Sequence, residues 1–273
     1  MNEVKKKQSK EPYVFILQID QCILGDLTYN RYEYDMYRTL NNINREKNIK
    51  YDTKIDLLRP GVLDFIEFIK KKYKNKIEIY IYSNHDHYWV NDIIGPYIQK
   101  QFKVNKPYFT NADKINNSFP LETIYNNVIY PMLVKKYKQS SPNINNVVFI
   151  NNEILLTHKD RQINVPLYEK LQYINIYDKM INLFGKDAFD NENILATYNR
   201  LSDKLSRLYL INDINEKDEV FRKLITLYNM RSVEVTNAKD DTYFSTLITK
   251  MKELPDFSDL SKLTNLEKKL KVL

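Results

Sequence analysis

Three short apolar runs, each followed at once by polar side chains, constrain the fold of this chain more than any other feature. They cover residues 14–17, 77–82 and 147–150. Apolar runs of this length are typical of strands buried on both faces of a parallel sheet. Because ligands bind beyond the carboxyl ends of such strands, the polar residues after the runs are predicted to line one pocket. These residues are Gln18, Asp20, Ser83, Asn84, Asn151 and Asn152.

Helical patterns alternate with these strands. Apolar residues recur at helical spacing over 62–69, 86–101 and 121–136, with an interruption predicted at Gly95-Pro96. Pro60 suits a helix start because its fixed φ fits the first turn. Weaker patterns predict a helix near 31–45, a short strand at 108–109 and an edge element at 164–168. The alternation of strands and helices predicts an α/β fold, a parallel sheet flanked by helices.

The pattern changes near residue 180. Apolar residues follow helical spacing over 194–208 and 220–228, and two further helices are predicted at 241–253 and 258–271. We therefore expect a basic, disordered tail over 1–11, an α/β domain over 12–180 and an all-helical C-terminal region over 181–273.

Composition limits the cellular compartments in which this chain is expected. The net charge is +7, Cys22 is the single cysteine, and no apolar run approaches the roughly 20 residues that a membrane span needs. The charged N-terminus lacks the apolar segment of a secretory signal. These features predict an intracellular protein of a reducing compartment, cytoplasmic or nuclear, without a membrane association. The 22 tyrosines, with many Asn, Ile and Lys residues, are typical of a low-GC genome such as that of a parasite or a large DNA virus.

Five motifs, taken in order, resemble the haloacid-dehalogenase-like (HAD-like) superfamily. The closest branch dephosphorylates the C-terminal domain of RNA polymerase II and includes the nuclear-LIM-interactor type. Residues 15–23 fill the frame of its first motif, which reads Asp-Leu-Asp-Glu-Thr after a hydrophobic strand, and 59–61 match its Arg-Pro-Gly. Residues 81–84 resemble its second motif, Lys135 stands where the family keeps a phosphate-binding lysine, and 147–152 match the strand that normally ends in Asp-Asp. The resemblance covers residues 12–180 and implies a HAD-like sheet.

The catalytic acids of that family are missing. Its nucleophile and Mg²⁺ ligand is an aspartate, but that position is Gln18, whose amide cannot attack phosphorus. The acidic pair is replaced by Asn151 and Asn152, although Mg²⁺ prefers carboxylates. Cys22 stands at the threonine position, and only Asp20, at the general acid/base position, is retained. We therefore expect a pseudophosphatase with no catalytic residue, metal or cofactor.

The resemblance also implies a setting. Because the active relatives act on RNA polymerase II, we expect an interaction module in a transcription complex, for example that of a large DNA virus. Its partners would be proteins, in a heterodimer or an RNA polymerase-associated complex. Two alternatives stay open: a transcription factor that binds nucleic acid through a basic surface, and a residual Mg²⁺-dependent protein phosphatase that uses Asp20 in a shifted register.

Several side chains admit two interpretations. The pocket either binds an anion through Ser83, Asn84 and Lys135, or is vestigial, with amides that satisfy one another. The sequence His85-Asp86-His87 is either a metal cluster or a helix start capped by Asp86, and capping is favoured. Cys22 is either a nucleophile or, as favoured, a small packing residue. Finally, Tyr29, Tyr32, Tyr34 and Tyr37 form either a base-stacking platform or, as favoured, a half-buried face.

Overall fold

The computed structural model describes residues 12–43, 55–74, 76–138, 143–152, 161–170, 181–182, 185–192, 194–196, 198–199 and 241–253. These residues fall into two compact units. The first contains the described residues within 12–23, 59–167 and 241–253, and the second those within 24–58 and 168–199. This division does not follow the predicted boundary at residue 180, and the predicted tail 1–11 lies outside the described residues.

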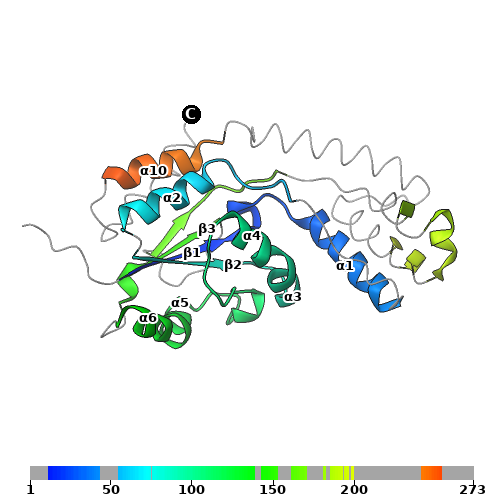
Figure 1. The fold of residues 1–273 in the computed structure, drawn as a ribbon, viewed down its shortest axis with the longest axis horizontal. Coiled ribbons are helices and arrows are strands. Elements are labelled where there is room, and N and C mark those ends of the chain that lie inside the picture. Colours follow the sequence, from blue (N-terminus) through cyan, green and yellow to red (C-terminus); the bar gives the residue numbers. More distant parts are fainter. Residues whose placement is uncertain are drawn as a thin grey trace, which may run out of the picture. The chain divides into compact units, whose positions relative to one another are not determined.

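A parallel sheet forms the centre of the first unit (Figure 1). Its strands are β1 (Tyr13–Gln18), β2 (Ile77–Tyr82), β3 (Val147–Asn151) and β4 (Gln162–Asn164), in the order β2-β1-β3-β4. All three pairings are parallel, and Leu17 stands opposite both Ile81 and Ile150. The three predicted strands are therefore neighbours in one register, which confirms the α/β class.

Helices cover both faces of this sheet. On one face, α2 (Val62–Lys72) packs against β1, with the rings of Phe15 and Phe65 6.2 Å apart. On the same face, α10 (Tyr243–Glu253) lies beside α2, with the rings of Phe65 and Phe244 5.3 Å apart (Figure 1). On the other face, α5 (Leu121–Ile124) and α6 (Tyr130–Tyr137) enclose a core that includes Val14 and Ile16. Burial on both sides explains the uninterrupted apolar runs, because neither face of β1 meets solvent.

Two prolines are accommodated within long helices in the same way, by a widened turn before each of them. The helical segment after β2 consists of α3 (His87–Trp89), a wide π-type turn at Val90–Ile94 and α4 (Gly95–Gln101). A second wide turn, at Tyr125–Ile129, separates α5 from α6. Pro96 and Pro131 are the second residues of α4 and α6. Because proline has no N–H and crowds the preceding turn, a widened turn lets each helix continue past it. The predicted interruption at Gly95-Pro96 is this turn.

The free edge of β2 is covered by the chain after α4. The N–H groups of Asn105 and Phe109 donate to the carbonyls of Ile79 and Ile81, and Phe109 forms a parallel bridge with Tyr82. The short strand predicted at 108–109 is this single bridge. Such cover satisfies strand groups that would otherwise be open to pairing with another chain.

A buried arginine ties together segments that are distant in sequence. The guanidinium of Arg59 lies 2.8 Å from the carboxylate of Asp241 and donates to the carbonyls of Pro166 (2.8 Å) and Cys22 (3.3 Å). It also stands over the ring of Tyr243, 5.3 Å from its centroid. Arg59 therefore fixes the start of α10 against the start of α2. The C-terminal helix predicted at 241–253 is confirmed as α10.

The second unit contains α1 (Thr28–Ile43), predicted at 31–45. The carboxylate of Asp26 accepts from the N–H of Thr28 (2.8 Å) and so satisfies one of the free donors at the helix start. Tyr34 and Tyr37 are buried, as the half-buried face requires. The predicted helices at 220–228 and 258–271 lie outside the described residues, and so does most of 194–208. Among the described helices, none has the length and apolar character to cross a membrane.

We expect Arg59→Met to lower the free energy of unfolding by about 3–5 kcal/mol, because the change leaves the largely buried carboxylate of Asp241 without its cation. Urea denaturation followed by circular dichroism measures the loss. Arg161→Met, which removes an exposed arginine bonded to Asn145, is the matched control and should cost less than about 1 kcal/mol. Equal losses in the two variants would contradict the role assigned to Arg59.

Candidate functional site

The predicted pocket residues meet at the carboxyl edge of the sheet. Gln18 ends β1, Ser83 and Asn84 follow β2, and Asn151 and Asn152 end β3 or follow it. In the order β2-β1-β3-β4, the connections leave β1 and β3 in opposite directions, so their carboxyl ends flank the position where parallel α/β sheets bind ligands. The site is therefore in the place that the sequence predicts.

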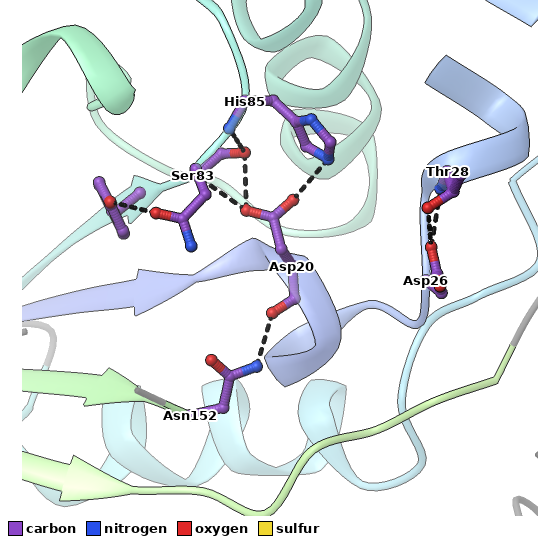
Figure 2. A network of polar contacts seen from close by, with 8 residues as sticks. Asp20, Asp26, Thr28, Ser83, His85 and Asn152 are labelled. Carbon is purple, nitrogen blue, oxygen red and sulfur yellow. Dashed lines mark hydrogen bonds and ion pairs between the residues drawn. The ribbon is translucent and has the colours of Figure 1, made fainter. Parts of the chain in front are cut away.

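Asp20 is the centre of this site (Figure 2). One carboxylate oxygen, Oδ2, accepts from the hydroxyl of Ser83 (2.8 Å) and from the backbone N–H of Asn84 (2.7 Å). The other, Oδ1, lies 3.2 Å from Nε2 of His85. The hydroxyl of Ser83 in turn accepts from the N–H of His85 (3.1 Å). The carboxylate is thus held by groups from the β2 end alone.

These contacts set the ionisation of Asp20. Burial raises the pKa of the carboxyl, but electrostatic attraction to His85, with hydrogen bonds from His85, Asn84 and Ser83, outweighs it and lowers the pKa below the ordinary value of 3.8. Asp20 is therefore a carboxylate at neutral pH.

The amides on the β1 and β3 ends bond to one another. The backbone N–H of Asn152 donates to Oε1 of Gln18 (2.9 Å), and its side-chain Nδ2 donates to the carbonyl of Asp20 (2.8 Å) (Figure 2). The side-chain oxygen of Gln18 and the backbone carbonyl oxygen of Asp20 therefore each accept a hydrogen bond from Asn152. An amide has donors where a carboxylate has only acceptors, so the bond to the carbonyl of Asp20 depends on asparagine at position 152, whereas the bond to Gln18 comes from the backbone.

Cys22 lies in the turn after β1 and has no exposed surface. Its thiol is 3.9 Å from the carbonyl of Ile150. The pKa of Cys22 is raised to about 12, mainly by burial; Arg59 opposes this shift and Asp20 adds to it. Because the thiolate is the reactive form, the packing role favoured by the sequence is the one that this environment supports.

Lys135 does not join the other residues expected to bind an anion. It is exposed on α6, and its neighbour Lys136 lies 2.6 Å from the carboxylate of Glu78, in the first half of β2. Glu78 and Tyr82 are four residues apart, about 13 Å along a strand. The expectation that Lys135 would stand beside Ser83 and Asn84 is therefore corrected. The family motif fixes only its place in sequence, and α6 ends at the opposite edge of the sheet.

His85 is the site residue that the sequence did not single out. The sequence offered either a metal cluster or, as favoured, a helix start capped by Asp86 at His85-Asp86-His87. No group of three or more His, Cys, Asp or Glu side chains within the described residues is arranged to hold a metal ion. Asp86 instead caps α3, accepting from the N–H of Trp89 (3.0 Å). The position of His85 directly after a buried strand, as for Ser83 and Asn84, is the signal that could have placed it here.

The order of these groups limits their chemistry. A serine nucleophile needs a histidine base within hydrogen-bonding distance of its hydroxyl. Here the carboxylate of Asp20 lies between Ser83 and His85, and the hydroxyl of Ser83 donates to that carboxylate. Ser83 is also fully buried. The arrangement is thus suited to holding Asp20 in place.

Comparisons of the chain with models of protein families, with curated proteins and with solved structures found no match.

We expect stability to depend on the charge of Asp20 in acid. Because the pKa of Asp20 is lowered on folding, its contribution is complete above the unfolded value of about 3.9 and is lost as pH falls through the folded value. Unfolding free energies from pH 6 to pH 2.5 should therefore fall more steeply for the wild type than for Asp20→Asn. Asp64→Asn, which removes an exposed carboxylate on α2, is the control. Parallel curves for the wild type and Asp20→Asn would refute this assignment.

We also expect the thiol of Cys22 to resist modification in the folded protein. At pH 8, Ellman's reagent should react with the native chain at least about 100-fold more slowly than with the urea-unfolded chain, because the thiol is buried and protonated. Rapid reaction of the native chain would show that the thiol is accessible.

Proposed function

We propose that this chain is a catalytically inactive, phosphatase-like interaction module. The observation that supports this proposal best is the closed bonding at the carboxyl edge. Gln18 stands where the resembled family has its nucleophile, and its side-chain oxygen accepts from the N–H of Asn152. A neutral amide that already accepts a hydrogen bond is a poor nucleophile towards phosphorus.

The charges at this edge also disfavour Mg²⁺. A hard cation of this kind is held by carboxylates and by other oxygens with free lone pairs. Asp20 is the one carboxylate among the predicted pocket residues, and it is bonded to Ser83, Asn84 and His85. The carbonyl of Asp20 already accepts from Asn152. A cation would have to displace these donors without gaining a second carboxylate.

The same bonding argues against the anion-binding interpretation of the pocket. The hydroxyl of Ser83 and the N–H of Asn84, the donors expected to meet a phosphate, both donate to Asp20. An external anion would have to replace that carboxylate and would meet its charge. We therefore favour the vestigial interpretation, in which the donors of the site bond to groups of the chain itself.

The proposed setting is a transcription complex, in which the chain contacts a protein partner. Support for this setting comes from the resemblance of residues 12–180 to phosphatases that act on RNA polymerase II. Affinity purification of the tagged full chain from its native source tests it. Recovery of RNA polymerase subunits in a fixed ratio to the chain supports the setting, and recovery of the chain alone overturns it.

The proposal of inactivity predicts background turnover of an aryl phosphate with Mg²⁺ for the wild type. Gln18→Asp should remain at background too, because Asn151 and Asn152 still supply no carboxylate. A rate above background that is abolished by Asp20→Asn would instead establish the residual phosphatase. Release of p-nitrophenol measures the rates.

A metal-binding assay provides a second test. By isothermal titration calorimetry, the wild type should not bind Mg²⁺ at millimolar concentrations. The combined change of Gln18, Asn151 and Asn152 to Asp should create measurable Mg²⁺ binding, because it places three carboxylates at neighbouring strand ends. Binding by the wild type, or by neither protein, would count against the family resemblance on which the proposal rests.

A further inference from the structure

Four helices of the first unit end in lysines. The last turn of α2 contains Lys70, Lys71 and Lys72, and that of α4 contains Lys100. The last turn of α6 contains Lys135 and Lys136, and that of α10 contains Lys250 and Lys252. Lysines at the ends of helices compensate the helix dipole, so one such end would need no further explanation.

The fold places these ends along one edge of the sheet. Lys136 at the end of α6 pairs with Glu78 in the first half of β2. The ammonium of Lys72, at the end of α2, donates to the carbonyl of Met251 at the end of α10. Helices that connect parallel strands run opposite to the strands, so their C-terminal ends lie at the amino ends of the strands.

Lysines outside the helices add to the charge at this edge. Lys74 and Lys76 lie in the connection from α2 to β2, and Lys103 follows α4; all three are exposed. Lys103 is close enough to Lys70 to act on it: burial and then the positive charge of Lys103 lower the pKa of Lys70. We call this surface, the lysines of the four helix ends with Lys74, Lys76 and Lys103, the basic edge.

Acidic side chains do not balance this charge. Glu78 is buried and already paired with Lys136. Glu67 lies one turn earlier on α2, and Glu253 is the last residue of α10. The lysines outnumber these acids, and three of them lie outside the helices, where dipole compensation does not account for them. Among the described residues, the lysines at the edge opposite Asp20 therefore outnumber the acidic side chains beside them.

We infer that the basic edge binds the phosphate backbone of nucleic acid. Exposed ammonium groups spread over several segments match a row of phosphates, which they contact as point charges and without reading bases. A protein partner fits this surface less well, because lysine is depleted from the cores of protein interfaces and aromatic anchors are enriched there. This binding is independent of the site around Asp20 and of the proposed interaction module.

The test is fluorescence anisotropy of the full chain with a labelled 20-base-pair duplex of arbitrary sequence. We expect binding that weakens steeply as salt rises from 50 to 200 mM, with a log–log slope of about −0.9 for each phosphate contacted. The double change Lys71→Glu and Lys103→Glu should weaken binding at least about tenfold at 50 mM salt and reduce the slope by about two.

A matched control separates this surface from net charge. Lys114→Glu with Lys186→Glu alters the net charge equally, but Lys114 follows the short helix at Asn111–Asp113 and Lys186 belongs to the second unit. It should weaken binding less than about threefold. If the first pair impairs folding, as judged by circular dichroism, Lys74→Glu with Lys252→Glu replaces it.

Three outcomes overturn the inference. The first is no binding of the duplex by the wild type at 50 mM salt, and the second is equal weakening by the two matched variants. The third is binding to phosphatidylserine vesicles or to polyglutamate without binding to the duplex, which would assign the surface to a membrane or to an acidic protein. Duplex binding that only the basic-edge variant loses supports the inference.

Discussion

The parallel pairing of β1 with both β2 and β3 is the constraint on which the rest of the first unit depends. Because β1 is flanked on both sides and covered on both faces, every residue from Val14 to Leu17 is buried. The register places Leu17 opposite Ile81 and Ile150. A shift of one residue would exchange the two faces of a strand and would also separate the polar groups at its end.

The pairing of β1 with β2 and β3 brings two sets of hydrogen bonds together at the carboxyl edge of the sheet. The end of β2 supplies donors to the carboxylate of Asp20, whereas the start of the segment after β3 supplies donors to Gln18 and to the carbonyl of Asp20. Four hydrogen bonds thus link the ends of β1, β2 and β3. Bonds between groups from three different strand ends hold this edge together, so its geometry depends on the register of the sheet.

The sequence predicts much of this arrangement, because strands that are buried on both faces consist almost entirely of apolar residues. The three central strands follow from their apolar runs, and α2 and the helix at 241–253 follow from helical spacing. The pairing of His85 with Asp20 and of Arg59 with Asp241 could not be predicted, because each depends on contacts between segments far apart in sequence. Lys135 shows a further reason. The motif fixes only how many residues separate Lys135 from the first strand. The edge of the sheet at which Lys135 lies depends on where α6 ends.

The pairing of Arg59 with Asp241 also bears on how the chain is made. The two residues are 182 positions apart, and α2 and three of the four strands, β2, β3 and β4, lie between them in sequence. During synthesis, the guanidinium of Arg59 emerges from the ribosome long before the carboxylate that neutralises it. Until then the nascent sheet has an uncovered apolar strip along α2, at Phe65, and an unpaired cation beside it. Docking of α10 then covers Phe65 and neutralises Arg59, so packing on this face of the first unit is completed only after the chain has been made as far as residue 253.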